Sequence, residues 1–177
     1  MKNIDIVYCC PQTSLPGFVD FPDREGYCIS VYFTGCTHNC PDCQNKSLQG
    51  MGRIETSYYV GEFISVLKEQ ASKIKTKKIC FLGGDPCVEQ NRYVLKHILS
   101  ALHDYETCVY TGYSYEDIKD FVVGAKYVVT EKFDKTQFVT PEKTDDYFQL
   151  ASKNQKIYNK KQELISKDGR LLYDRIY

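Results

Sequence analysis

Three cysteines lie close together in the stretch GCTHNCPDCQN, residues 35–45: Cys36, Cys40 and Cys43. Their spacing would line them along one face of a helix. Pro41, however, lacks the backbone N–H that a helix interior needs and would clash with the preceding turn. The glycine and asparagine of the same stretch also favour irregular backbone. The stretch is therefore predicted to be a loop, and a polar loop that brings three thiols together indicates a metal centre.

Two kinds of metal centre fit these thiols. A structural zinc ion takes three cysteines and a histidine, with His38 as the fourth ligand, but His38 is only two residues from each flanking cysteine. No second ligand pair is evident in the sequence. A ferredoxin-type cluster takes four cysteines, and none follows Cys43 until Cys80. A cubane iron–sulfur cluster held by three thiolates would instead leave one iron open to an outside ligand, much as a catalytic zinc keeps one position free.

A second group of residues that suits ligand binding is Gly83-Gly84-Asp85-Pro86, directly after the predicted strand at residues 78–82. Two glycines at the carboxyl end of a strand allow a ligand to approach the backbone. The free carbonyl groups and Asp85 can accept hydrogen bonds from an ammonium group. Taken alone, the same residues are more typical of a plain strand-to-helix turn.

Together, the two motifs carry a resemblance to a known superfamily. The spacing Cys36-x3-Cys40-x2-Cys43 after a predicted strand resembles the cluster loop of radical S-adenosylmethionine (SAM) enzymes. Residues 83–86 resemble the motif with which these enzymes hold the methionine amino group. The resemblance implies a [4Fe–4S] cluster with three cysteine ligands, whose open iron is chelated by SAM. It also implies that one electron from the reduced cluster cleaves SAM to methionine and a 5′-deoxyadenosyl radical.

A narrower resemblance, to the activating proteins of anaerobic ribonucleotide reductases, covers most of residues 18–158. Two segments carry it specifically: FVDFPDREGYCISVYFTGCTHNCPDCQN and FLGGDP. Two further segments support it: YTGYSYEDI at residues 110–118 and SKNQKI at residues 152–157. This resemblance implies an activase whose partner is a glycyl-radical enzyme, the anaerobic ribonucleotide reductase, and whose electron donor is a flavodoxin or ferredoxin.

The resemblance assigns roles to individual residues. It implies three cluster ligands and three residues that position the methionine end of SAM: Cys36, Cys40 and Cys43, and Gly83, Gly84 and Asp85. Asp42 stands where an aromatic residue often packs on adenine, and Thr111 lies at the exit of the third strand, so both are candidate SAM contacts. Residues 130–133 depart from the family's acidic-glycine segment, and no contact is carried over from them. Cys87 stands where an aliphatic residue is more usual; we expect it to be a buried apolar residue of the core, and a redox-exposed thiol near SAM is the alternative.

Hydrophobic patterns predict the elements that must position these residues. A short strand at residues 4–9 is expected to end in the turn-rich stretch 11–17, and Ser57 is expected to cap the first helix. Ser114 and Asp117 indicate the start of a short third helix. The predicted order is strand 27–34, helix 57–74, strand 78–82, helix 94–102, strand 107–111, a helix from 114 and strand 125–129, with weaker strands at 155–158 and in a hairpin over 164–173.

Alternating strands and helices predict a parallel sheet with crossover helices. A full eight-fold barrel needs about 250 residues, whereas this chain has 177. The expected fold is therefore α/β: a partial, open (β/α) barrel of the radical SAM type with a mostly parallel sheet. The expected organisation is a single domain over residues 1–177.

The composition indicates which binding partners and which cellular compartment to expect. Lys and Arg together number 23, as do Asp and Glu, so no net charge draws the chain to nucleic acid or to an anionic membrane. No apolar run reaches the length of a membrane span, and the N-terminus lacks a signal-peptide core. Nine cysteines without a secretion signal favour the reducing cytoplasm. Cys28, Cys80 and Cys108 lie in strand-like runs and are expected in the core.

The sequence thus predicts an enzyme that generates a radical on a glycine of a partner protein, without nucleic acid or membrane. Activation of another glycyl-radical enzyme, such as a pyruvate formate-lyase type, remains open, as does a small-molecule radical SAM reaction. A non-catalytic zinc-binding interaction module is the alternative from another class. Metal analysis separates the classes, because a cluster gives iron with acid-labile sulfide whereas the module gives zinc.

Overall fold

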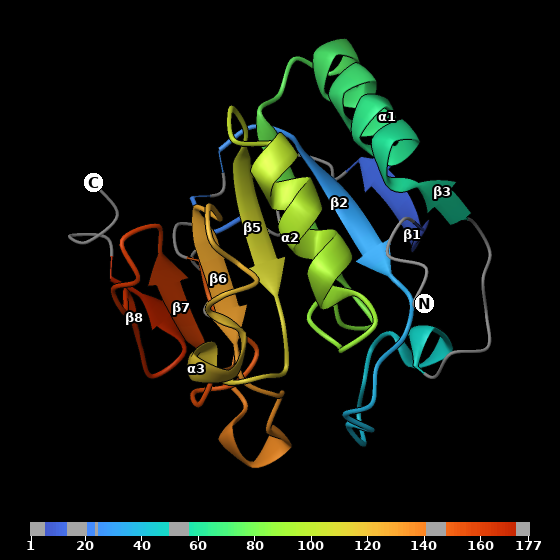
Figure 1. Cartoon of the computed structure of the whole chain (residues 1–177). Coiled ribbons are helices and arrows are strands. Elements are labelled where there is room, and N and C mark those ends of the chain that lie inside the picture. The colour runs from blue at the N-terminus through green and yellow to red at the C-terminus, as the bar shows by residue number, and fades with distance from the viewer. Residues whose placement is uncertain (1–5, 14–20, 24, 50–56, 141–147, 173–177) are drawn as a thin grey trace.

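The computed structural model describes residues 6–13, 21–23, 25–49, 57–140 and 148–172. Its main feature is a seven-stranded sheet with the strand order β3-β1-β2-β4-β5-β6-β7 (Figure 1). The seven strands are β1 (Ile6–Thr13), β2 (Cys28–Phe33), β3 (Ser57–Tyr59), β4 (Lys78–Gly83), β5 (Glu106–Tyr110), β6 (Tyr127–Thr130) and β7 (Lys156–Asn159). The helices are α1 (Val60–Lys73), α2 (Arg92–Ala101) and α3 (Tyr115–Ile118), with 3-10 turns η1 (Lys46–Leu48) and η2 (Lys135–Gln137).

The centre of the sheet consists of the four strands β2, β4, β5 and β6, which pair in parallel. Each successive pair is joined through a helix, α1, α2 or α3, as crossover connections require. The edges are antiparallel, with β1 on β2, β3 on β1, and β7 on β6. The predicted α/β class, its mostly parallel sheet and the alternation of elements are therefore confirmed. The predicted hairpin near the C-terminus is also confirmed, as β8 (Ser166–Lys167) and β9 (Arg170–Leu171).

The prediction that the first strand ends at Cys9, before a turn that starts at Pro11, is wrong. Strand β1 continues to Thr13, and Pro11 pairs with Val31 of β2. The reason lies in the pairing on the other side, because β3 pairs only with residues 6–8 of β1. Beyond residue 8, no described strand pairs with the outer side of β1, and proline is tolerated on such edges. Residues 4, 5 and 14–17 of the predicted strand and turn lie outside the described residues.

The prediction that Ser57 caps the first helix is also wrong. Ser57 lies in β3 and pairs with Tyr8, and the helix begins at Val60 with Tyr59 as its N-cap residue. Pairing with β1, a partner distant in the sequence, overrides the local capping preference. The predicted apolar face of the helix is confirmed, and its buried residues are Val60, Phe63, Leu67 and Ala71. Ser114 is the N-cap residue of α3, and its hydroxyl donates to Asp117 at 2.7 Å.

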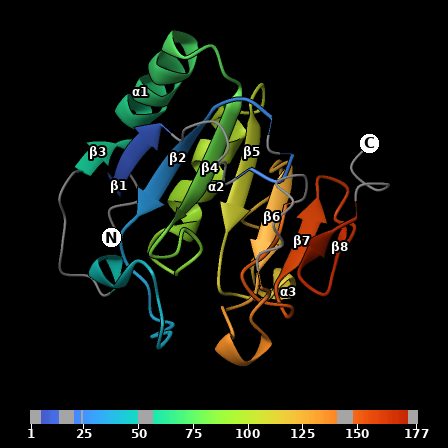
Figure 2. The same cartoon turned by 180° about the vertical axis from the view of Figure 1, so that it is seen from behind.

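The two faces of the sheet form two separate hydrophobic clusters. Figure 1 views the sheet from the side of α1 and α2, and Figure 2 from the opposite side. The helix side includes Ile29, Val31, Phe33, Ile79, Phe81 and Val109. The opposite side includes Cys28, Cys80 and Cys108, together with Phe21, Tyr127 and residues of the C-terminal segment. The expectation that these three cysteines belong to the core is confirmed, since each is fully buried.

All four parallel strands end at the same edge of the sheet, the lower edge in Figure 2. The loops that leave β2, β4, β5 and β6 therefore meet there. In open α/β sheets, ligands bind outside the carboxyl ends of the strands. This edge, which we call the carboxyl edge, is where the residues singled out in the sequence come together. Within the described parts of the chain, no helix has the length and apolar character needed to cross a bilayer.

Candidate active site at the carboxyl edge

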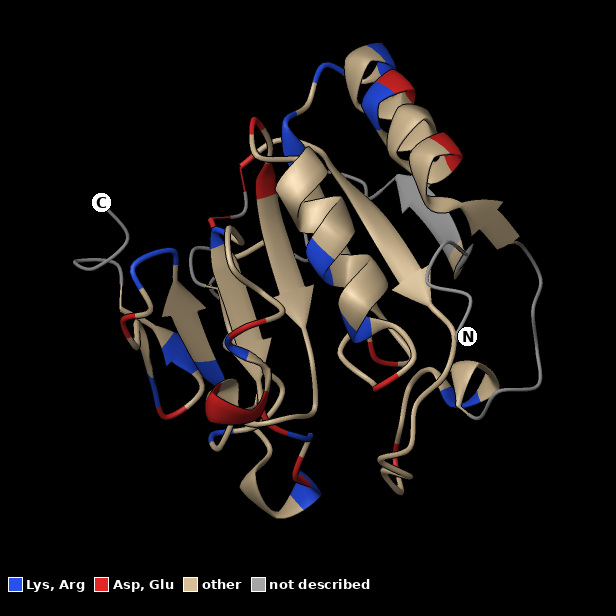
Figure 3. Cartoon of the chain, viewed as in Figure 1, with Lys and Arg blue, Asp and Glu red and all other residues tan. Residues whose placement is uncertain are grey.

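The cysteine loop leaves β2 and runs from Thr34 to Asn45 without helix or strand, as predicted. Backbone hydrogen bonds fix its start. The N–H of Gly35 donates to the carbonyl of Leu48 at 2.9 Å, and the carbonyl of Gly35 accepts from the N–H of Asp85 at 2.9 Å. Gly35 has a φ of +90°, in the left-handed region that favours glycine. The loop therefore closes on itself and docks on the exit of β4. It carries few charged residues (Figure 3).

The three cysteines of this loop lie near one another. Cys36 is buried, whereas Cys40 and Cys43 are half-buried and joined by a turn in which the N–H of Cys43 donates to the carbonyl of Cys40. Burial is the main cause that raises the pKa of the Cys36 thiol, and a hydrogen bond from the backbone N–H of His38 opposes it in part. The negative charges of Asp85, Cys40 and Cys43 raise this pKa further. A coordinating thiol is deprotonated by the metal that it binds, so this raised pKa does not prevent Cys36 from acting as a ligand.

Three thiols on one loop are the ligand type that an iron–sulfur cluster takes. Among the residues that the structure describes, no three His, Cys, Asp or Glu side chains converge closely enough to hold one metal ion. A cubane cluster places its thiolates on different irons, so its ligands lie wider apart than those of a single zinc ion. His38, the fourth ligand of the zinc alternative, has its Nε2 2.7 Å from the carboxylate of Asp85, so this nitrogen is engaged within the chain. The donor set at the loop thus fits an iron–sulfur cluster.

The side chain of Asp85 lies at the centre of the carboxyl edge and is 1% exposed. Its Oδ1 accepts from the backbone N–H of Cys87 at 2.7 Å and from the hydroxyl of Thr111 at 2.9 Å. Its Oδ2 accepts from the backbone N–H of Gly112 at 2.9 Å and lies 2.7 Å from Nε2 of His38. Both oxygens are therefore occupied by donors of the chain itself, which come from the loops after β2, β4 and β5.

Two of the predicted SAM residues thus lie in one network. The hydroxyl of Thr111, which is 7% exposed, donates to both oxygens of Asp85, at 2.9 and 3.0 Å. A buried carboxylate without donors is costly, so this network stabilises the junction of the loops. Direct contact of either side chain with SAM stays a prediction.

The glycines of the predicted SAM motif allow the chain to pack closely on itself. A Cβ at Gly83, which has a φ of +113°, would lie 2.6 Å from the backbone of Phe33. A Cβ at Gly84 would lie 2.6 Å from the carbonyl oxygen of Gly35 and 2.8 Å from that of Leu48. Gly83 is therefore required for the close packing of β4 on β2, and Gly84 for the docking of the cysteine loop on β4. That SAM also approaches their backbone stays a prediction.

Asp42, the remaining predicted SAM residue, lies on the surface. Its side chain is 49% exposed and pairs at 3.1 Å with Lys135 of η2. An exposed ion pair of this kind contributes about 0–1 kcal/mol, so it orients Asp42 weakly. The pair nevertheless brings the connection after β6 alongside the cysteine loop. An adenine contact at Asp42 stays a prediction.

The exit of β6 is held by the late segment at residues 152–157. Glu131 has a φ of +75°, and its carbonyl accepts from Nε2 of Gln155 at 3.4 Å. Nδ2 of Asn154 donates to the carbonyl of Lys132 at 2.8 Å. The side-chain oxygen of Asn154 is buried and has no hydrogen-bond partner within the described chain. Residues 131–132 and 154–155 therefore lie side by side at the carboxyl edge, although more than 20 residues separate them in the sequence.

Two asparagines that lock these loops were not singled out from the sequence. Nδ2 of Asn45 donates to the carbonyl of Gly83 at 3.3 Å. Nδ2 of Asn91 donates to the carbonyls of Thr34 and Asp85, at 3.0 and 3.1 Å. Asn91 is the N-cap residue of α2, a position where asparagine is common, but its side chain makes no capping bond. The position of Asn91 before α2 thus predicts a helix cap, whereas its side chain joins the loops that follow β2 and β4.

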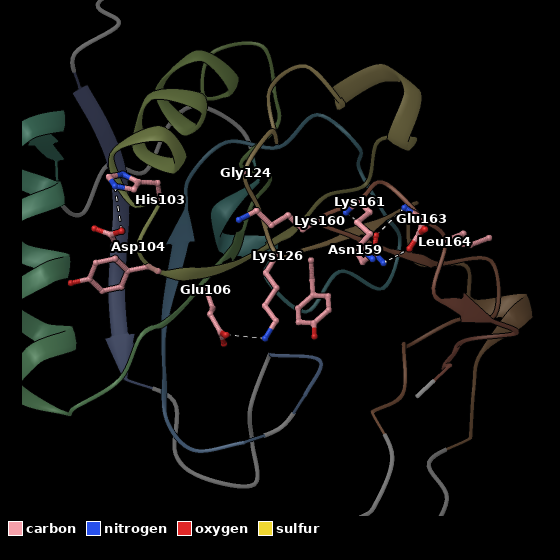
Figure 4. A pocket seen from close by; sticks show the side chains of 12 residues that line it. His103, Asp104, Glu106, Gly124, Lys126, Asn159, Lys160, Lys161, Glu163 and Leu164 are labelled. Atoms are coloured by element: carbon pink, nitrogen blue, oxygen red, sulfur yellow. Dashed lines mark hydrogen bonds and ion pairs between the residues drawn. The ribbon is translucent and has the colours of Figure 1, made fainter. Parts of the chain in front are cut away.

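A hollow at the opposite edge, shown in Figure 4, does not contribute to this site. It lies at the amino-terminal ends of β5 and β6. Four of its lining side chains form two close pairs: Lys126 lies 3.0 Å from Glu106, and His103 lies 3.3 Å from Asp104. Because ligands of parallel sheets bind at the carboxyl ends, the candidate site is the edge that carries the cysteine loop.

Comparison with known proteins agrees with this site. A family model described as "4Fe-4S single cluster domain" matches residues 23–158, which include the cysteine loop and all four parallel strands. The class defined by the fold and the loop is thus a single-cluster iron–sulfur domain.

Several curated relatives are anaerobic ribonucleoside-triphosphate reductase-activating proteins. That of Enterobacteria phage T4 is 30% identical over 139 residues, which cover 71% of this chain and 81% of the relative. That of Escherichia coli K12 is 28% identical over 106 residues, 56% of this chain and 68% of the relative. That of Vibrio cholerae O1 is 24% identical over 108 residues, 58% and 68% respectively. The chain belongs to the family of anaerobic ribonucleoside-triphosphate reductase-activating proteins.

Differences in burial among the cysteines predict different reactivities. Cys87 is fully buried, as expected for a residue of the core, and burial followed by the charge of Asp85 raises the pKa of its thiol strongly. Because the thiolate is the reactive form, iodoacetamide should alkylate Cys40 and Cys43 of the iron-free protein well before Cys87. Peptide mass spectrometry of a time course measures the order. Equal rates at Cys87 and Cys40 in the folded protein would contradict the burial described.

The close packing at Gly84 predicts a large effect of a small substitution. In Gly84→Ala the new Cβ meets the carbonyls of Gly35 and Leu48, so the cysteine loop must shift. We expect the free energy of unfolding to fall by about 1–3 kcal/mol, as for other overpacked sites. Gly61→Ala on α1 is the matched control, since nothing lies within 4 Å of its added Cβ. Urea unfolding measures both, and equal stability of the two variants would contradict the docking of the loop.

Proposed function

We propose that this protein is a radical SAM activase that generates a glycyl radical on an anaerobic ribonucleotide reductase. The observation that carries the proposal is the cysteine loop, which docks on the glycine turn after the next parallel strand. The chain matches a 4Fe-4S domain, and its relatives are named for the activation of this reductase. We also propose that the fold is a partial, open barrel of the radical SAM type. An open sheet with edge strands β3 and β7 supports it.

In this proposal Cys36, Cys40 and Cys43 hold a [4Fe–4S] cluster. Their position on one loop at the carboxyl edge supports the assignment. When bound, the cluster and SAM supply the electron transfer and the radical chemistry. The protein binds and orients both groups and excludes water from them.

For SAM, we propose that Gly83, Gly84 and Asp85 position the methionine end mainly through their backbone. The carboxylate of Asp85 supports this division, because its oxygens already accept from the chain itself. Thr111 shapes the site through Asp85, and Asp42 stands at its outer rim, where it is half exposed. Carbonyl groups at the end of a parallel strand are suitable acceptors for an ammonium group.

The partner completes the reaction. We propose that the reductase presents a glycine-bearing loop across the cysteine loop at the carboxyl edge. The net change takes one electron from a donor such as a flavodoxin or ferredoxin and one hydrogen atom from the glycine Cα. It converts SAM to methionine and 5′-deoxyadenosine and leaves the radical on the glycine. A reducing cytoplasm is the proposed location, which suits cysteines that form no disulfide among the described side chains.

The cluster assignment predicts a difference between the loop cysteines and the core cysteines. Protein prepared without oxygen should hold about four irons per chain, the content of one cubane cluster. Alanine at Cys36, Cys40 or Cys43 should remove most of this iron. Alanine at the buried Cys80 or Cys108 is the matched control and should leave it in place. Iron and acid-labile sulfide analysis measures both, and full loading of Cys40→Ala would refute the assignment.

The activase proposal predicts a radical on the partner. Reduced protein, SAM and the reductase from the same organism should together give a glycyl doublet in the EPR spectrum, with 5′-deoxyadenosine formed in step. Omission of SAM is the control and should abolish both signals. Formation of 5′-deoxyadenosine without a radical on the reductase would contradict this partner and favour another glycyl-radical enzyme or a small molecule.

A further inference from the structure

We propose that His38 is a positioning residue, which sets the place of the cysteine loop relative to the SAM turn through its hydrogen bond to Asp85. The inference rests on the proposed function and deepens it. His38 lies between two proposed cluster ligands, Cys36 and Cys40. Its side chain is only 7% exposed, and its Nε2 lies 2.7 Å from Oδ2 of Asp85. The span that holds two ligands is thus anchored in the interior by one side chain.

Residues directly after β5 define the space that the His38 ring occupies. The ring occupies the space next to Gly112, where a Cβ would lie 2.5 Å from Cδ2 and 2.6 Å from Nε2 of the histidine. Tyr113 packs against the same ring edge to face, with centroids 4.6 Å apart and planes at 64°. The absence of a side chain at Gly112 and the contact with Tyr113 therefore define where the ring can lie.

The acceptor of this hydrogen bond is itself immobilised. Asp85 is held by backbone N–H groups on both sides, those of Cys87 and Gly112, and by the hydroxyl of Thr111. Its own backbone N–H donates to Gly35 at the start of the cysteine loop. A donor fixed to such a rigid acceptor has little freedom, so His38 transmits the position of the β4 and β5 exits to the loop.

The other polar side chains between Cys36 and Cys43 do little to fix the position of the loop. Most of its polar side chains are exposed, namely Thr37, Asn39, Asp42 and Gln44. Asn45 reaches Gly83, but it lies after the last cysteine. Between Cys36 and Cys43, His38 is the polar side chain that the described structure turns inward. Loss of His38 should therefore leave all three thiols available while loosening their place relative to residues 83–85.

Because His38 positions the loop but is not a proposed cluster ligand, its loss should weaken SAM binding more than it reduces iron content. In His38→Ala we expect near-normal iron content but SAM binding weakened about 10- to 100-fold, as for loss of a buried hydrogen bond to a charged group. In His38→Gln, whose amide can donate to Asp85, we expect most of the affinity to return. Thr37→Ala, an adjacent exposed position, is the matched control and should bind SAM like the wild type.

The experiment titrates SAM into the reduced cluster proteins and follows the change of the EPR signal. Iron content and amide hydrogen exchange of residues 36–45 in the iron-free proteins are measured alongside, and exchange should rise in His38→Ala. If the wild type shows no response to SAM, the proposed function itself fails. If the wild type responds, an affinity of His38→Ala within about twofold of it would overturn the positioning role. Loss of iron in parallel with affinity, or no rescue by glutamine, would overturn it as well.

A double variant tests whether His38 acts through Asp85. Because coupled residues are not additive, His38→Ala combined with Asp85→Asn should bind SAM no more weakly than Asp85→Asn alone. Affinity losses that add fully would show that the two side chains act independently, which would contradict the proposal.

Discussion

The burial of one carboxylate organises the carboxyl edge of this protein. A charged group removed from water is costly unless donors surround it, and Asp85 obtains its donors from the exits of β2, β4 and β5. Each loop is thereby tied to the same two oxygens. The cysteine loop could not lie elsewhere without leaving a buried charge short of partners. The proposed cluster site and the proposed SAM site thus share one fixed reference point.

Close backbone packing reinforces this arrangement. Gly83 and Gly84 let the end of β4 touch β2 and the cysteine loop, and Gly112 makes room for His38. The glycines allow the loops to approach one another closely, and the hydrogen bonds to Asp85 then hold the loops in place. On the far side of the sheet, residues 163–165 hydrogen-bond to β7, so the chain itself covers that edge.

Local patterns predicted much of the fold and the position of the candidate site. The buried strands β2, β4 and β5 and the apolar face of α1 follow from periodicity, which acts over a few residues. The extent of β1 past Pro11 and the strand at Ser57 depend on pairing with distant segments, so the sequence misled there. The same holds for Asp85, whose partners His38 and Thr111 are 47 and 26 residues away. Their chemistry could be read from the sequence, but their contact could not.

We propose that the cysteine loop and the turn after β4 form one site, in which SAM reaches an iron that no cysteine holds. Mössbauer spectroscopy of protein reconstituted with ⁵⁷Fe tests it most directly, because each iron reports its own ligands. SAM should change the isomer shift of about one iron in four and leave the others as they were. Irons that are all alike, and that do not respond to SAM at saturating concentration, would contradict it.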